Sequence, residues 1–259
     1  MEWFKHWLAL AACLWVCCSG PVQADGLVQV PTRGDQSIGY WWMPTEGATA
    51  TVLLLSGGNG GIGLRDGQPR SENFLIRSRD LFRAEGFNVA LLGNPSDKRA
   101  MDDAWRTSEM HRTDVAAVVQ DIRAKGAGQP LWLIGTSRGT ISAAALAIAM
   151  PDQVAGVVLT ASVAGFNVPA AVQRQPIEQL RMPVLVYHHR EDACRITLAH
   201  DAEWIFKGLK QARVKKFWLV DGGESPSGNP CEALHWHGFI GMEWRVVTDV
   251  GSWIRQPSP

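Results

Sequence analysis

This sequence of 259 residues lacks the features that mark several large classes of protein. It carries 25 basic and 25 acidic residues, so its formal net charge is zero, and it contains no long run of like charge. Without a basic excess, a surface for nucleic acid or for an anionic membrane is not expected. The zinc-binding spacings CxxC and HExxH are also missing. A small neutral or singly charged molecule is therefore the expected partner, and nothing in the sequence indicates the oligomeric state.

Long hydrophobic runs are scarce too. A membrane-spanning helix needs about 20 apolar residues, whereas the apolar stretch Trp7–Cys18 is shorter and no later stretch is long and apolar enough. A lysine before this stretch, a Gly-Pro break after it and small residues ahead of Asp25 are typical of a secretory signal. We expect residues 1–24 to be a signal peptide and residues 25–259 to form a periplasmic or secreted protein. As an alternative, Leu10–Cys13 resembles a lipoprotein processing box, which would leave its cysteine lipidated.

Only two cysteines, Cys194 and Cys231, lie beyond the expected signal peptide. An even number of cysteines in an exported protein favours a disulfide bond. The bridge would close a loop of 37 positions (231 − 194), which is worth about 4 kcal/mol in the chain-entropy model. The alternative is a pair of free, buried thiols.

The mature sequence predicts one globular α/β domain. With 46% hydrophobic and 19% charged residues, the chain can bury a substantial core. Strand-like runs such as 50–58 and 87–97 alternate with amphipathic helical runs such as 73–86 and 111–126. This alternation indicates a mostly parallel sheet with helices on both faces. Residues 27–44 are expected to form an antiparallel pair at the sheet edge.

A GxSxG pattern, Gly135-Thr136-Ser137-Arg138-Gly139, joins one expected strand to an alanine-rich helix. Such a turn exposes the serine hydroxyl at the carboxyl end of the strand, where open α/β sheets bind ligands. The glycines are needed because neighbouring backbone leaves no room for side chains there. The following helix starts at the serine, and its dipole favours negative charge at that point. Ser137 is therefore the candidate nucleophile.

The chain resembles the α/β-hydrolases. The resemblance includes the strand and helix alternation, "GTSRG", a glycine-rich loop after an earlier strand, "HHREDACR" after a late strand and "HWHGF" before the last helix. About twenty residues separate "VVLTAS" from "PVLVYHH", which is too short for a large cap domain. The resemblance implies hydrolysis of an ester, thioester or amide through a covalent acyl-enzyme, with no cofactor. It leaves open the acyl group, the leaving group and the choice among esterase, thioesterase and peptidase.

The same resemblance implies an acid and a base that follow the serine in the chain. The acid comes from the turn after a late strand, where Asp192 fits the family pattern better than Glu191. The base is His237 or His235, and "HGF" before the last helix favours His237. In a triad of this kind the histidine takes the proton of the serine hydroxyl, and the acid orients the imidazole.

The glycine-rich loop is expected to supply the oxyanion hole. Its N–H donor would be Gly58 or Asn59, and Arg138 would be the second donor. Ser56 stands where many relatives carry a histidine, which leaves the identity of the first donor open by a residue. The side chain of Arg138 would pair with Asp97 or another acid of the scaffold, or with a substrate carboxylate. Trp236 is a candidate substrate contact.

Three other interpretations follow from the same segments. Gly58–Gly63 fits GxGxxG, a dinucleotide-binding pattern, but residues 64–73 would interrupt the helix that the motif requires. A metal-dependent hydrolase could use a late cluster of zinc-ligand residue types. A third possibility is an exported binding protein with a hydrolase fold and no activity. The residues of the late cluster are His188, His189, Asp192, Cys194, Cys231, His235 and His237.

Overall fold

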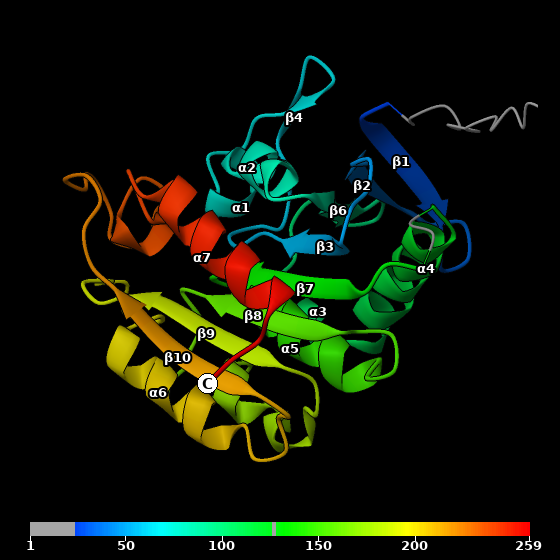
Figure 1. Cartoon of the computed structure of the whole chain (residues 1–259). Coiled ribbons are helices and arrows are strands. Elements are labelled where there is room, and N and C mark those ends of the chain that lie inside the picture. The colour runs from blue at the N-terminus through cyan, green and yellow to red at the C-terminus, as the bar shows by residue number, and fades with distance from the viewer. Residues whose placement is uncertain (1–23, 126–127) are drawn as a thin grey trace, which may run out of the picture.

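The computed structural model describes residues 24–125 and 128–259, and the expected signal peptide lies outside the described residues except for Ala24. An eight-stranded sheet forms the centre, in the order β1-β2-β6-β3-β7-β8-β9-β10 (Figure 1). Only β2 runs against the others, because it is antiparallel to both β1 and β6. The strands are β1 (Gly26–Pro31), β2 (Ser37–Met43), β3 (Ala50–Leu55), β6 (Phe87–Pro95), β7 (Leu131–Thr136), β8 (Gly156–Thr160), β9 (Val184–His189) and β10 (Lys215–Val220).

Helices cover both faces of the sheet, as predicted. One face packs on α4 (Glu109–Lys125), α5 (Gly139–Ala149) and α6 (Ala199–Gly208), and the other on α1 (Phe74–Arg77), α2 (Arg79–Ala84) and α7 (Glu243–Arg255). The short helix α3 (Asp103–Arg106) lies beside α4 and α5. The predicted mostly parallel α/β sheet and the edge pair β1–β2 are confirmed.

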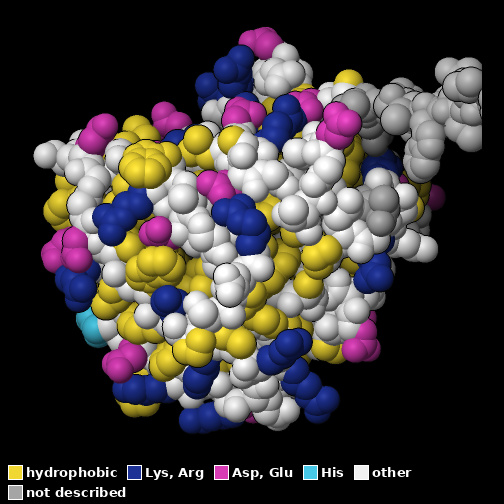
Figure 2. All heavy atoms as spheres, in the orientation of Figure 1, with side chains coloured by type: hydrophobic (Ala, Val, Ile, Leu, Met, Phe, Trp, Pro, Cys, Tyr) yellow, Lys and Arg dark blue, Asp and Glu magenta, His cyan; other side chains and the backbone are white. Residues whose placement is uncertain are grey.

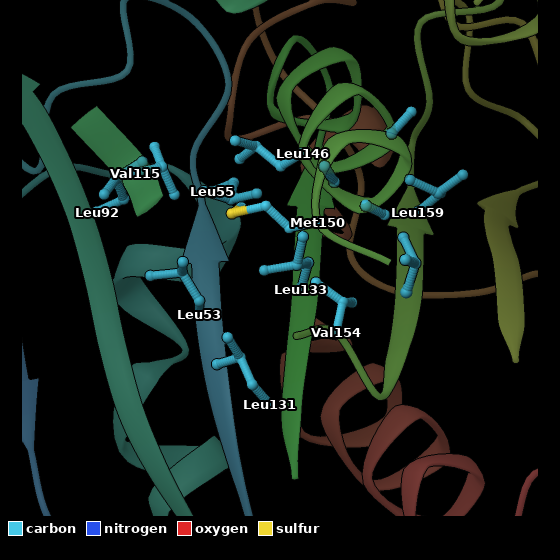
Figure 3. Close-up of a cluster of buried hydrophobic side chains, with 14 of the residues drawn as sticks. Leu53, Leu55, Leu92, Val115, Leu131, Leu133, Leu146, Met150, Val154 and Leu159 are labelled. Carbon is cyan, nitrogen blue, oxygen red and sulfur yellow. The ribbon is translucent and has the colours of Figure 1, made fainter. Parts of the chain in front are cut away.

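Two hydrophobic cores result from the alternation of side chains along each strand. Leu53 and Leu133 face the helices α4 and α5, as Figure 3 shows, whereas Val52 and Ile134 face α1, α2 and α7. All four side chains are fully buried. Nearly continuous apolar strands are expected when helices cover both faces of a parallel sheet. The outer surface is more polar than these cores. On the face shown in Figure 2, side chains of both charges are interspersed among hydrophobic ones.

Two expected helices are shorter than their sequence patterns indicate. The run 73–86 forms two helices because Ser78 leaves helical geometry, with φ −93° and ψ 3°. The last helix begins only at Glu243, since Phe239 and Gly241 adopt left-handed conformations with φ of 57° and 71°. Between β8 and β9 the described chain forms two short 3₁₀ helices, η1 (Val172–Arg174) and η2 (Ile177–Gln179), and no large cap domain. No helix among the described residues is long and apolar enough to cross a membrane.

Two fully buried histidines lie in this scaffold. Nε2 of His188, at the end of β9, accepts a hydrogen bond of 2.8 Å from the backbone N–H of Ser162, and burial lowers the pKa of His188 to about 4. Nε2 of His111, on α4, lies 3.0 Å from Oγ of Ser142. Burial, with a smaller contribution from the nearby Arg106, lowers the pKa of His111 to about 3. Both imidazoles are therefore neutral in the folded protein at neutral pH.

These histidines should make the protein less stable in mild acid. Below pH 6.5 the unfolded chain binds protons at both imidazoles, whereas the folded chain binds them only near the lowered pKa values of about 4 and 3. The free energy of unfolding should therefore fall as the pH drops from about 6.5 to 4.5, by roughly 2 kcal/mol for each histidine. Urea unfolding at several pH values measures this slope. His188→Gln, which keeps a hydrogen-bond acceptor, should reduce the slope, while the same change at the exposed His200 should not.

Candidate active site

Ser137 occupies a strained turn between β7 and α5. Its φ of 52° is positive, which is rare for a residue other than glycine. A Cβ atom on Gly135 would lie 2.6 Å from the carbonyl oxygen of Gly139, and one on Gly139 would overlap the carbonyl oxygen of Leu55. The structure thus shows why both outer positions of the GxSxG pattern are glycine. Backbone from β3 and α5 fills the space that a side chain would need.

Hydrogen bonds to neighbouring elements hold this turn. The N–H of Ser137 donates to the carbonyl of Thr160 at 3.1 Å, and the Thr160 hydroxyl donates to the carbonyl of Gly135 at 3.0 Å. The Thr140 hydroxyl donates to the carbonyl of Ser137 at 2.6 Å. These contacts tie the turn to the end of β8 and to the first turn of α5. The strain at Ser137 is therefore fixed from both sides.

Asp192 and His237 form a buried pair. Asp192 lies in the turn after β9, and His237 lies in the 3₁₀ helix η3 (Trp236–Gly238). Nδ1 of His237 is 3.0 Å from Oδ2 of Asp192, and the other carboxylate oxygen accepts the N–H of Cys194 at 2.9 Å. The alternative acid, Glu191, is exposed to solvent. Nδ1 of the alternative base, His235, has no hydrogen-bond partner among the described residues.

Thr197 completes this pair and was missed by the sequence analysis. Its fully buried hydroxyl donates to Oδ2 of Asp192 at 3.0 Å. The hydroxyl oxygen Oγ1 of Thr197 also lies 3.0 Å from Nδ1 of His237. A second donor on the carboxylate fixes both its position and that of the imidazole. Thr197 follows the acid by five residues in irregular chain, so no periodicity or motif distinguishes it in the sequence.

Removing the hydroxyl of Thr197 should lower kcat more than it changes KM. Thr197→Val keeps the volume but removes a hydrogen bond to a charged group, worth about 1.5–3 kcal/mol, so kcat should fall roughly 10- to 100-fold. KM should stay close to that of the wild type because Thr197 lines neither cavity next to Ser137. Thr197→Ser is the matched control and should retain most of the activity. If the valine and serine variants lose activity equally, the methyl group matters and the hydroxyl does not.

The serine and the histidine line one cavity of about 270 Å³, together with Gly57, Gly58 and Asn59. A second cavity, of about 590 Å³, also reaches Ser137 and Gly58. No hydrogen bond joins the Ser137 hydroxyl to His237 within the part of the chain that the structure describes. Catalytic contacts of this kind are often long before substrate binds. The structure thus brings Ser137 to the same cavity as His237, whose imidazole is paired with the buried Asp192.

The glycine-rich loop after β3 packs directly against the nucleophile. A Cβ atom on Gly57 would lie 2.7 Å from Cβ of Ser137. The loop turns at Gly58, whose φ is 55°, and the N–H of Gly60 closes the turn on the carbonyl of Gly57 at 3.0 Å. The backbone N–H groups expected to form the oxyanion hole, those of Gly58, Asn59 and Arg138, donate no hydrogen bond to any described residue.

The alternative ligands predicted for these segments find little support in the geometry. After Gly58–Gly63 the chain forms the small hairpin β4–β5 (Leu64–Arg65 and Gln68–Pro69), and the next helix begins only at Phe74. A dinucleotide would need a helix that starts within the motif. Among residues 24–125 and 128–259, no three His, Cys, Asp or Glu side chains are grouped so that they could hold a metal ion.

The side chain of Arg138 pairs with Asp103 on α3, at 3.3 Å. The expected pairing with a scaffold acid is confirmed, but the acid is Asp103 and not Asp97, which pairs with Arg33 from the β1–β2 turn at 3.1 Å. The sequence indicated a scaffold acid but could not show that α3 packs beside the start of α5. Trp236, the candidate substrate contact, lines neither of the two cavities next to Ser137. It stacks on His189, with ring centroids 5.5 Å apart.

A disulfide bond joins Cys194 to Cys231. Cys194 is buried two residues after Asp192, and Cys231 is exposed six residues before His237. The bridge therefore connects the loop of the candidate acid to the loop of the candidate base. Cys231 also lines both cavities beside Ser137. Paired in this way, neither sulfur is a free thiolate for a metal ion.

Comparisons with known proteins agree with this fold. Residues 99–190 match the family model described as serine aminopeptidase, S33. This segment includes Ser137 and ends before Asp192 and His237. No curated protein sequence matches the chain.

Solved structures superpose along most of the chain at low sequence identity. An esterase of Pyrococcus furiosus has a TM-score of 0.66 and 13% identity, over 90% of this chain and 91% of its own. A dienelactone hydrolase from Anabaena variabilis has a TM-score of 0.60 and 13% identity, over 90% and 97%. A cold-adapted esterase from an Arctic intertidal metagenomic library has a TM-score of 0.60 and 16% identity, over 90% and 93%. The chain has the α/β-hydrolase fold, as its sequence predicts.

Proposed function

We propose that this protein is a serine hydrolase that cleaves a small ester, thioester or amide through an acyl-enzyme on Ser137. The observation that carries the proposal is that the strained Ser137 and His237, which is paired with the buried Asp192, line one cavity. The esterases and the dienelactone hydrolase among the structural neighbours favour an ester. No cofactor is needed for this chemistry.

In the proposed reaction, Nε2 of His237 takes the proton of the Ser137 hydroxyl as Oγ attacks the substrate carbonyl. Asp192 accepts a hydrogen bond from Nδ1 of His237 and stabilises the imidazolium that forms. The carbonyl oxygen gains negative charge, which N–H donors of Gly58 or Asn59 and of Arg138 stabilise. His237 then returns the proton to the leaving group, and a water molecule releases the acyl group by the same steps.

A fluorophosphonate probe tests this proposal directly. The purified protein is treated with the probe, and mass spectrometry locates the adduct. Labelling of Ser137 that disappears in Ser137→Ala, together with loss of ester hydrolysis in that variant, is the expected result. Activity that a chelator abolishes without labelling would instead favour a metal-dependent hydrolase. If the probe does not react and no ester is cleaved, the proposal is wrong and a binding protein is favoured.

We further propose that residues 1–24 direct export and that residues 25–259 form the mature domain in the periplasm or outside the cell. The apolar stretch and the residues before Asp25 support the cleavage position. The Cys194–Cys231 bond suits an oxidising compartment. N-terminal sequencing of the protein from periplasmic and culture fractions should find Asp25 as the first residue. A lipidated Cys13 at the N-terminus would show lipoprotein processing instead.

A further inference from the structure

Arg106 is a buried cation that the proposed reaction does not yet use. It ends α3 and is only 1% exposed. No described carboxylate lies within ion-pair distance of its guanidinium, because the nearby Asp103 pairs with Arg138 instead. Burial, which outweighs the attraction of Asp103 and Asp102, lowers the pKa of Arg106 to about 10. A buried charge without a counter-ion costs stability, so its position calls for a reason other than folding.

The guanidinium spans the two segments expected to form the oxyanion hole. Nη2 donates to the carbonyl of Gly58 at 3.2 Å, and Nη1 donates to the hydroxyl of Ser142 on α5 at 3.2 Å. Gly58 belongs to the loop that packs against Ser137, and Ser142 lies one turn into α5, the helix that begins two residues after Ser137. Arg106 therefore links the glycine-rich loop to α5 through these two hydrogen bonds.

This contact matters because a glycine-rich loop has few conformational restraints of its own. Glycine has the widest choice of backbone angles, and Gly57, Gly58, Gly60 and Gly61 lie within five positions. A hydrogen bond to the carbonyl of Gly58 fixes the plane of the peptide between Gly58 and Asn59. The N–H of Asn59 belongs to that peptide, and the N–H of Gly58 precedes it by two rotatable bonds. Either candidate donor is thus positioned by the same clamp.

The positive charge of Arg106 should also stabilise the oxyanion, in addition to positioning the N–H donor. The side chain contacts the loop at the Gly58 carbonyl and is buried, and electrostatic interactions in such an environment are stronger than in water. A donor bound to the Gly58 carbonyl also polarises the peptide, which strengthens the N–H of Asn59. The negative charge on the substrate oxygen develops only as the reaction proceeds. A preorganised positive charge therefore stabilises the transition state more than the bound substrate.

We propose that Arg106 is a positioning residue for the oxyanion hole: its buried guanidinium holds the Gly58 carbonyl and so sets the N–H donor that the loop presents beside Ser137. This inference rests on the proposed serine hydrolase function. It predicts that changes at Arg106 lower the rate of acyl transfer without a matching change in the binding of ground-state substrate.

The test uses Arg106→Met, Arg106→Gln and Arg106→Lys in the mature protein, with p-nitrophenyl acetate as substrate. A trifluoromethyl ketone serves as a mimic of the tetrahedral oxyanion. For Arg106→Met we expect kcat to fall about 10- to 100-fold, the range below the loss of a direct oxyanion donor, with KM changed less than about threefold. The inhibition constant of the ketone should rise by a similar factor as kcat/KM falls. Arg106→Lys, which keeps the charge and one donor, should retain more activity than Arg106→Gln or Arg106→Met.

Arg255→Met is the control for general destabilisation, since Arg255 pairs with Glu85 at 2.8 Å away from both cavities. Unfolding curves give the folded fraction of each variant, and rates are compared per folded molecule. If Arg106→Met does not fold, kcat of Arg106→Lys is compared with kcat of Arg106→Gln. The inference then requires the lysine variant to be the faster of the two.

The inference is overturned if the folded Arg106 variants match the wild type in kcat and in ketone affinity while wild-type Ser137 is labelled by the fluorophosphonate. A wild-type protein that is neither labelled nor active would overturn the proposed function first, and this inference with it.

Discussion

His237→Gln should lower kcat for an ester substrate by about 10⁴-fold or more, whereas His235→Gln should leave kcat within about tenfold of the wild type. His237 is the imidazole next to Asp192, at 3.0 Å, so its loss leaves Ser137 without a group that accepts the hydroxyl proton. The side chain of His235 is buried two residues earlier but has no described partner at Nδ1. Glutamine keeps a polar side chain of similar size at each position, which makes the two variants a matched pair.

A double variant makes this prediction sharper. Catalytic groups that act as one unit are not additive, so Ser137→Ala combined with His237→Gln should be no slower than the slower single variant. Two independent losses that multiply would show that the serine and the histidine do not act in one step. Initial rates at saturating substrate, with active protein counted by folded fraction, give kcat for each variant. A large loss in His235→Gln with little loss in His237→Gln would transfer the role of the base to His235.

Breaking the disulfide bond should cost both stability and activity. Replacing both cysteines by alanine should lower the free energy of unfolding by about 4 kcal/mol, from the chain entropy of a loop of 37 positions. Alanine is the better replacement because Cys194 is 1% exposed, and a serine hydroxyl there would be buried. The bridge connects the loops of Asp192 and His237, and a displacement of 1 Å between catalytic groups can cost about a hundredfold in rate.

Urea unfolding measures the loss of stability. The loss of activity is measured as kcat at a urea concentration well below the unfolding midpoint. Chemical reduction of the wild type gives an independent route, since Cys231 is exposed and accessible to a small reductant. If kcat per folded molecule is unchanged once mass spectrometry shows that the bridge is broken, the disulfide stabilises the fold but does not position the catalytic groups.

The features that the sequence predicts correctly are local or periodic. The strand runs around Leu53 and Leu133 are apolar because helices cover both faces of the sheet. The GxSxG pattern predicts a tight turn because the glycines are needed where Leu55 and the start of α5 approach. These properties depend on short segments of chain, so one sequence is enough to predict them.

The features that the sequence does not predict depend on which segments meet in space. Thr197 and Arg106 lie in a loop and at the end of a short helix, and each acquires its contacts only through the packing of distant chain. The partner of Arg138 is Asp103 because α3 lies beside α5, and spacing along the chain does not distinguish Asp103 from Asp97. Whether Gly58 or Asn59 supplies the oxyanion-hole N–H depends on the orientation of single peptide groups in the loop.

The position of the candidate base in the chain has a consequence for biosynthesis. His237 follows β10, the last strand of the sheet, and its loop leads into α7. A growing polypeptide whose ten strands had all emerged from the ribosome would still lack His237 beside Ser137. On the proposed mechanism, acyl transfer would therefore begin only after the chain beyond β10 had been made. Such a delay would keep a partly synthesised chain inactive.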